Sequence, residues 1–426
     1  MILQFVYGGS KSTRGDGAGC RPDYGRGVRN QVVAISFVVC LIAGALTIQL
    51  VRPPDRGPDC TPLSVSSVVR DEGWTRRFAA YGDGNARLDD WTGADGTWSV
   101  RLPDGRTIWI FADTFLGPVQ PGPNPRGQPY PWRSPFATPL IRNSAILQGT
   151  DGSLITLRGS TGNGTPAAWI GHGSIYWPMS AVVDGGALRV FLQRIEGSDR
   201  EHPFGIVRRA AVATVPLADL SKPRAITMLP EPHQESYDEQ VFYGLGTLRA
   251  GRYFYVYGTT SNTTRNGHSA YLARVPVGRV ADPGEWEYWH GRDRDGAAAG
   301  DWGGVRQARP VLPFVPGRSG VSAGFSVVRH GGTYVLFTMD PTRPAGGISH
   351  IASYWSCGPA GPWHGPAPVY DPPEVVPGGT TYAYFPFAHP EQGGPGLLLS
   401  YVLNDTRRIH DNVGLYRPKF IRVSLR

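Results

Sequence analysis

Lysine is scarce in this chain, and its basic residues form no clusters. Only three of the 42 Lys and Arg residues are lysines, at positions 11, 222 and 419. Residues 1–52 hold six basic and two acidic residues, which leaves 36 basic and 32 acidic residues for the remainder. The formal charge of +8 therefore reflects arginines scattered along the chain. Because no basic run is present, we expect no nucleic-acid partner.

Several motifs that define enzyme classes are also missing. The sequence has no His-Glu-x-x-His helix, no cysteine cluster and no phosphate-binding glycine loop. These absences argue against a metalloprotease, a zinc site and a nucleotide-dependent enzyme, so we expect no cofactor and no metal ligands. A calcium ion in a central channel stays an open alternative. No WD dipeptide pattern recurs, which weighs against an interaction propeller.

Long apolar runs are rare, and only residues 31–51 could span a bilayer. Basic residues precede this run, so we expect residues 1–30 to be cytoplasmic and the rest extracytoplasmic. The alternative is a signal peptide cleaved near Ala43-Gly44-Ala45. The chain would then be a single-pass membrane protein or a secreted one, with a linker at residues 52–74.

Cysteine is limited to four residues. Cys20 and Cys40 would lie in the cytoplasm and the membrane, which leaves Cys60 and Cys357 on the oxidising side. We therefore expect a disulfide between these two residues, with a pair of free thiols as the alternative.

Glycine, proline and aromatic residues are abundant, with 57 Gly, 39 Pro, 12 Trp and 19 Tyr. This composition indicates an all-β protein of short strands joined by turns. Five units of strand, Gly-rich turn and strand can be read, at roughly 60 to 70 residues each. We predict a five-bladed β-propeller over residues 75–426, ahead of a β-sandwich or a β-helix.

The most informative segment is a predicted hairpin with an acid at each open end. Strand-like residues 97–102 and 107–111 flank a turn at Asp104-Gly105, a strong hairpin signal. A three-residue loop that also includes Pro103 would place Asp95 opposite Asp113, and a two-residue loop would shift them by one. Opposed Cβ atoms lie about 4.5–5.5 Å apart, and paired glycosidase carboxyls lie about 5–9.5 Å apart. The alternative is that each Asp merely caps a turn.

Other polar and aromatic residues are expected at the same mouth of the propeller. Glu239, before the third inner strand, is a third candidate acid. Trp177 and Tyr384 could stack on sugars, although most aromatic residues in such sheets are core. Asn143 could bind a hydroxyl or hold a loop. His389 could bind substrate, orient a carboxylate or lie in a surface turn.

Several motifs follow one another in an order shared with a known family: Asp95-Gly96-Thr97, Asp104-Gly105-Arg106, Phe111-Ala112-Asp113-Thr114, Asn143-Ser144 and His389-Pro390-Glu391. Residues 75–425 resemble an actinobacterial five-bladed propeller family, formerly a domain of unknown function, that includes endo-D-arabinanases. More distantly they are similar to arabinanase and xylosidase propellers. The resemblance implies that Asp95 and Asp113 match the family's acids, although Ala112 replaces the usual glycine.

These observations favour a glycoside hydrolase of the cell surface or the medium that acts on a furanoside-rich, arabinan-type polysaccharide. Asp95 and Asp113 would be its carboxyl pair. We expect a monomer whose partners are the polysaccharide and, through the N-terminal helix, the membrane. The main alternative is a propeller that binds a glycan without cleaving it, and a structural propeller is the third reading.

Overall fold

The computed structural model describes residues 60–426 except 85–86, 88, 172, 199, 201, 203–204, 231–238, 261, 263–266, 292–301 and 344–348. These residues belong to a compact unit, Pro58–Arg426. The predicted cytoplasmic segment 1–30 and the predicted anchor 31–51 lie outside the described residues. Among those described, no helix has the length and apolar character needed to cross a membrane.

Strands dominate the described residues, which confirms the predicted all-β class. The one α-helix among them is α1 (Glu72–Asp83), and the Asp71 side chain caps it by accepting a hydrogen bond from the Trp74 amide. Short 3-10 turns among the described residues include η2 (Pro283–Glu285), η3 (Val305–Gln307) and η5 (Val413–Tyr416).

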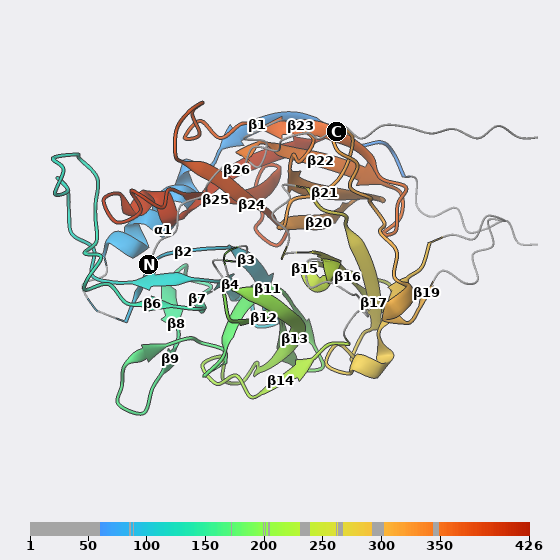
Figure 1. Ribbon diagram of the computed structural model, residues 1–426, viewed down its shortest axis with the longest axis horizontal. Helices are drawn as coiled ribbons and strands as arrows, with labels where there is room; N and C mark the ends of the chain where they lie inside the picture. The colour runs from blue at the N-terminus through green and yellow to red at the C-terminus, as the bar shows by residue number, and fades with distance from the viewer. Residues whose placement is uncertain are drawn as a thin grey trace, which may run out of the picture. The chain divides into compact units, whose positions relative to one another are not determined.

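Five antiparallel sheets of four or five strands carry most of this unit (Figure 1). The first contains β3 (Trp98–Arg101), β4 (Thr107–Phe111), β7 (Ser144–Gln148) and β8 (Leu154–Leu157). The second contains β11 (Ile175–Asp184), β12 (Ala187–Glu196), β13 (Ile206–Pro216) and β14 (Ala225–Met228). The third contains β15 (Phe242–Ala250), β16 (Tyr253–Thr259), β17 (Tyr271–Pro276), β18 (Glu287–Trp289) and β19 (Trp302–Gly303).

The fourth and fifth sheets complete the series. The fourth contains β20 (Phe325–His330), β21 (Thr333–Met339), β22 (Ile351–Ser356) and β23 (His364–Tyr370). The fifth contains β24 (Tyr382–His389), β25 (Leu397–Asn404), β26 (Pro418–Leu425) and β1 (Val65–Arg70). The first strands of the five sheets, β3, β11, β15, β20 and β24, contact one another in a closed cycle. Residues at the start of these five strands therefore lie at the same end of the cycle.

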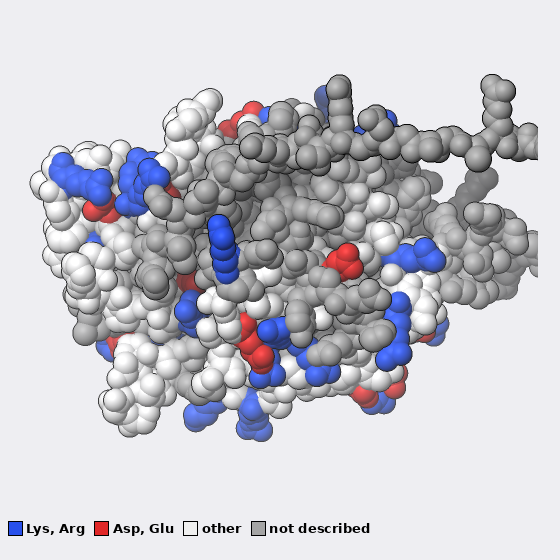
Figure 2. Space-filling model, in the orientation of Figure 1, with Lys and Arg blue, Asp and Glu red and all other residues white. Residues whose placement is uncertain are grey.

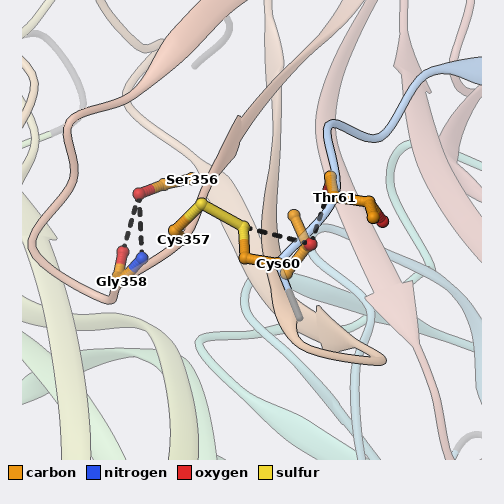
Figure 3. Close-up of a disulfide and its surroundings, with 6 residues drawn as sticks. Cys60, Thr61, Ser356, Cys357 and Gly358 are labelled. Atoms are coloured by element: carbon orange, nitrogen blue, oxygen red, sulfur yellow. Dashed lines mark hydrogen bonds between the residues drawn. A yellow bond between two sulfur atoms is a disulfide. The ribbon is translucent and has the colours of Figure 1, made fainter. Parts of the chain in front are cut away.

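The N-terminal strand closes the fifth sheet. β1 pairs with the C-terminal strand β26, with Val68 opposite Val423. A disulfide joins Cys60, just before β1, to Cys357, just after β22 of the fourth sheet (Figure 3). The predicted linker 52–74 was therefore wrong from residue 65 onward, where β1 and the start of α1 belong to the folded unit. Short alternation in an edge strand gives a weak sequence signal, and its partner is more than 350 residues away.

Aromatic side chains fill the spaces between neighbouring sheets. Trp98 of β3 lies 4.3 Å, ring centre to ring centre, from Phe387 of β24. Phe78 of α1 packs on Trp109 of β4 edge to face, with ring centres 5.1 Å apart, and stacks on Phe420 of β26 at 5.5 Å. Because these rings are buried, they fix the first and fifth sheets against each other.

Two smaller sheets extend the first sheet at the end where its hairpin opens. One contains β2 (Trp91–Ala94), β5 (Thr114–Leu116) and β6 (Leu140–Ile141), and the other contains β9 (Gly159–Ser160) and β10 (Pro166–Ala167). In Figure 1 the hairpin that carries β9 projects away from β8. On the face shown in Figure 2, basic side chains are scattered, and several lie beside acidic ones.

Candidate active site

The predicted hairpin forms with the three-residue loop. Arg101 pairs with Thr107, the Leu102 amide donates to the Arg106 carbonyl, and Gly105 adopts a φ of 88°. A residue with positive φ at the end of a three-residue loop is usually glycine, because glycine has no Cβ to clash. The sequence therefore fixes the register of this hairpin locally.

The same register places Asp95 opposite Asp113. Beyond both residues the pairing resumes in β2 and β5, where Ala94 faces Thr114. The Asp95 amide donates to the Asp113 carbonyl at 2.9 Å. Opposed residues of an antiparallel pair project to the same face of the sheet, so the two carboxyls are neighbours. Both residues are half-buried and therefore remain accessible to solvent.

A third side chain continues this row across the strands. Thr114 of β5 pairs with Ile141 of β6, so the next pair in the same register is Asp113 and Arg142. The Arg142 guanidinium lies 3.2 Å from the Asp113 carboxyl. On its other side, the Trp177 indole of β11 donates to Asp113 at 3.0 Å. Asp113 thus has a cationic partner and a neutral donor, and Trp177 reaches the site as a hydrogen-bond donor.

Tyrosine side chains surround Asp95. Tyr384, at the start of β24, and Tyr416, in η5, both hydrogen-bond its carboxyl group. Burial and the nearby Asp95 charge hold the pKa of each hydroxyl well above the usual value, so both are neutral donors. Tyr384 therefore binds the carboxyl of Asp95. The Asp95 carboxylate also accepts the Gly96 amide at 2.9 Å.

The backbone next to Tyr384 is strained. Phe385 has a φ of 55°, the left-handed region that a bulky residue rarely adopts. The pairing of β24 with β25 shifts its register between Tyr384 and Phe387, as at a β-bulge. A bulge changes the direction in which side chains point. This one changes the direction of the side chains at the start of β24 relative to those in the rest of the strand. Strain of this kind is often found at functional sites.

The two carboxyl groups have different electrostatic surroundings. Burial and, to a smaller extent, the Asp113 charge together raise the pKa of Asp95 to about 7, against the opposing effect of hydrogen bonds from Tyr384, the Gly96 amide and Tyr416. Burial also raises the pKa of Asp113, but Arg142 and the Trp177 indole act in the opposite direction. Near neutral pH Asp95 is therefore the better proton donor, and Asp113 the better anion.

The third candidate acid precedes the first strand of the third sheet. Glu239 is exposed, just before β15. Its charge acts on Tyr271 of β17, where it contributes to a raised pKa. Among the described residues, no hydrogen bond or ion pair joins Glu239 to Asp95 or Asp113. Glu239 shares the end of the cycle where the first strands begin, and its part in the chemistry stays a prediction.

Asn143 is fully buried and holds a loop in place. Its side-chain amide donates to the carbonyls of Ile170 and Tyr176, at 3.0 and 2.9 Å. Its side-chain oxygen accepts the Ile170 amide at 2.7 Å. The side chain is thereby committed to the backbone that leads into β11, which leaves it poorly placed to bind a sugar hydroxyl.

His389 lies at the other end of β24 and is fully buried. Its ring packs on Trp109 in a tilted arrangement, with the ring centres 4.9 Å apart, and its nitrogens contact the hydroxyls of Ser99 and Ser400 at 2.5 and 2.9 Å. Burial lowers its pKa to about 3, so the ring is neutral. The structure therefore places His389 in the core and not beside Asp95, because five residues of extended strand separate it from Tyr384.

Sequence reasoning missed Arg142 and Tyr416. Arg142 had a sequence signal, because it directly precedes Asn143 in a motif that follows Asp113. Only the pairing of β5 with β6, however, places Arg142 opposite Asp113. Tyr416 had no sequence signal, since its position depends on the packing of η5. Among the described residues, no group of three or more His, Cys, Asp and Glu side chains is arranged to hold a metal ion.

The chain belongs to the family described as a domain of unknown function, DUF5005, whose model matches residues 78–425. This match contains the hairpin with both aspartates and extends to the last strand of the fifth sheet. No curated protein matches the sequence.

Solved structures resemble this chain to different degrees, and the first described below shares its fold. A protein from Bacteroides ovatus is 20% identical with a TM-score of 0.61, and the match covers 84% of this chain and 90% of that one. A mutant of the α-L-arabinanase from Cellvibrio cellulosa is 12% identical with a TM-score of 0.39, over 78% and 91% of the two chains. A GH43 enzyme from Xanthomonas citri, complexed with xylose, is 13% identical with a TM-score of 0.41, over 82% and 92%.

Proposed function

We propose that the five sheets are the blades of a β-propeller and that the chain is a glycoside hydrolase, with Asp95 and Asp113 as its carboxyl pair. The observation that carries this proposal is the register that sets the two carboxyls side by side at an accessible end of the sheets. The raised pKa of about 7 at Asp95 supports it, because glycoside hydrolysis requires one protonated and one ionised carboxyl.

In this mechanism Asp95 is the general acid. Its proton passes to the glycosidic oxygen as the bond to the anomeric carbon breaks, and positive charge develops on the sugar. Asp113, kept ionised by Arg142 and the Trp177 indole, acts on the anomeric carbon as nucleophile or as base for a water molecule. Tyr384 and Tyr416 hold the Asp95 carboxyl in place throughout. The two carboxyls supply the proton transfers, so the reaction needs no cofactor.

We propose a furanoside-rich, arabinan-type polysaccharide as substrate, cleaved by an endo-arabinanase-like activity. The motifs around Asp95 and Asp113 support this choice through their resemblance to propellers that include endo-D-arabinanases. Ala112, where those propellers usually have glycine, is buried directly before Asp113 and donates its amide to the Asp95 carbonyl at 2.8 Å. Because Ala112 lies within the site, its extra methyl group can give this protein a substrate preference different from that of those propellers.

We further propose that the enzyme works outside the cytoplasm, as an anchored or secreted monomer. The disulfide between Cys60 and Cys357 supports this location, because such bonds persist in oxidising compartments. Residues 31–51 would provide the anchor or the signal peptide.

The test is the release of oligosaccharides from mycobacterial-type arabinogalactan, plant arabinan and xylan by the purified protein. We expect products from an arabinan-type polymer and none from Asp95→Asn or Asp113→Asn. Thermal unfolding of each variant controls for misfolding. Binding of a polymer by the wild type without any cleavage would instead favour the glycan-binding alternative, and equal cleavage by the variants would remove both aspartates from the mechanism.

A further inference from the structure

A cavity of about 570 Å³ lies beside the carboxyl pair. Its walls come from the hairpin of β9 and β10, including Ser160, Gly162 and Ala167, and from Arg142 and Ser174. Ligand sites in proteins commonly have volumes of about 300–1,000 Å³, so this cavity has the size of a binding site. Neither the mechanism above nor the family assignment gives it a role.

The cavity adjoins the charged side chains of Asp113 and Arg142. Arg142 lines it and also lies 3.2 Å from the Asp113 carboxyl. Ile175 lines it from β11, two residues before Trp177, which donates to Asp113. Alternate residues of a strand share a face, so Ile175 and Trp177 point the same way. Two separate elements thus connect the cavity to Asp113.

Asn143 gives the cavity a fixed wall. Its buried side chain makes three hydrogen bonds to Ile170 and Tyr176, the residues that bracket the wall segment Gly171, Gly173 and Ser174. Gly171 has a φ of 82°, and a Cβ there would approach the Tyr176 ring to 2.2 Å. Only glycine permits this close approach. The wall is therefore built by specific residues.

The lining of the cavity indicates the chemistry of its ligand. Among the described residues, the polar groups of the lining are the hydroxyls of Ser160, Thr161 and Ser174 and the guanidinium of Arg142, which already pairs with Asp113. Of the lining residues that the structure describes, the others have small or aliphatic side chains, and none is aromatic or carries a carboxylate. This set suits a neutral, polyhydroxylated ligand better than an ion or a flat aromatic molecule.

We propose that this cavity binds the sugar residues next to the cleaved bond and so makes the enzyme act within long glycan chains. The inference rests on the proposed glycosidase function and adds a second sugar-binding subsite, separate from the carboxyl pair. A chain that passes over Asp95 and Asp113 would continue past Arg142 into the cavity. The hairpin of β9 and β10 would then determine which polymers are accepted.

The test fills the cavity with a bulky side chain. Gly162 lines it, has no positive φ, and has no atom within 4 Å of an added Cβ, so Gly162→Trp should fold. Gly162 lies in the turn of the hairpin, and Ala167→Trp, on β10, is a second filling variant. We expect kcat/KM on linear arabinan to fall about tenfold, mainly through KM, and kcat/KM on a 4-nitrophenyl arabinofuranoside to stay within about twofold.

Gly393→Trp is the matched control. Gly393 is also exposed, without positive φ and without an atom within 4 Å of an added Cβ, but it lies in the turn between β24 and β25, outside the cavity lining. It should leave both substrates unaffected. Equal losses on polymer and aryl glycoside, or no loss with either filling variant, would overturn the subsite.

A separate readout distinguishes this inference from the proposed function. If the wild type cleaves none of the polymers, the hydrolase proposal fails, and retardation of the protein in gels containing arabinan or arabinogalactan then tests the cavity. Retardation that Gly162→Trp loses and Gly393→Trp keeps would support a glycan site. Unchanged retardation, or none by the wild type, would overturn it.

Discussion

Two clusters of titratable side chains lie at opposite ends of β24, and they differ in what surrounds them. At the start of the strand, Tyr384 binds Asp95, which neighbours Asp113. At its end, His389 joins Ser99, which also donates to the Glu391 carboxylate. Both clusters contain groups with shifted pKa values, so burial of ionisable groups by itself does not distinguish a reactive site from a structural one.

Accessibility and unsatisfied bonding capacity make the difference. The Asp113 side chain is 19% exposed, and the cavity beside it is open to a ligand. His389 is fully buried, packs against Trp109, and uses both ring nitrogens. A substrate can reach the first cluster, while the second is already satisfied by protein groups. We therefore assign chemistry to the first and stability to the second.

Removing one carboxyl charge from each cluster should have the largest and most contrasting effects. Asp113→Asn should lower kcat by about 10²–10⁴-fold, because the ionised group is lost, with little change in stability. Glu391→Gln should leave kcat within about twofold and lower the free energy of unfolding by about 1–3 kcal/mol, through weakened bonds to Ser99. Steady-state kinetics and urea unfolding of both variants measure this. Loss of activity in Glu391→Gln would break the distinction.

Replacing the buried imidazole should affect stability alone. His389→Phe keeps a ring against Trp109 but leaves the hydroxyls of Ser99 and Ser400 without their partner. We expect the free energy of unfolding to fall by about 2–4 kcal/mol. Activity well below the melting temperature should equal that of the wild type. A selective rise in KM with unchanged stability would return His389 to substrate binding.

The two clusters should respond to pH in opposite directions. The pKa of Asp95 is raised from 3.8 to about 7, so its contribution to stability is present in acid and is lost as the pH rises through 7. The pKa of His389 is lowered from 6.5 to about 3, so its contribution is present above 6.5 and is lost as the pH falls toward 3.

Activity should also fall about tenfold per pH unit above 7, as Asp95 loses the proton it must donate. Melting temperatures and kcat/KM measured from pH 4 to 9 test both statements. Asp95→Asn should remove the alkaline loss of stability and keep the acidic one. An alkaline loss that persists in this variant would contradict the assignment to Asp95.

The smallest effect concerns the indole that contacts Asp113. Trp177→Phe removes a hydrogen bond of 3.0 Å that lowers the pKa of Asp113, and it keeps an aromatic ring in place. We expect kcat/KM to fall about three- to tenfold and the acidic limb of the pH profile to move to higher pH. A fall in kcat/KM with an unmoved acidic limb would make Trp177 a sugar contact only.

Prediction from the sequence succeeded where the interactions are local. The turn residues Asp104 and Gly105 predicted the hairpin and left a two- or three-residue loop open. The three-residue loop that forms places Asp95 opposite Asp113. For Asn143 the sequence left two roles open, binding a sugar hydroxyl or holding a loop, and the structure shows the side chain bonded to a loop. For His389 it left substrate binding, orienting a carboxylate and a surface turn open, and the structure buries the ring in the core. Both are polar residues next to predicted strands, and the sequence does not show that their polar atoms are taken by backbone carbonyls or by serines of other segments.

The sequence by itself determined the all-β class and the hairpin that joins the two carboxyls, because composition and turn chemistry act over a few residues. The cysteine pair was inferred differently, from which cysteines would lie on the oxidising side, and the structure joins them across 297 residues. Only the tertiary structure decided that β1 closes the fifth sheet, that Arg142 and Trp177 meet at Asp113, and that Tyr384 and Tyr416 enclose Asp95. These contacts join residues distant in sequence, and their strength comes from burial, which depends on how the sheets pack.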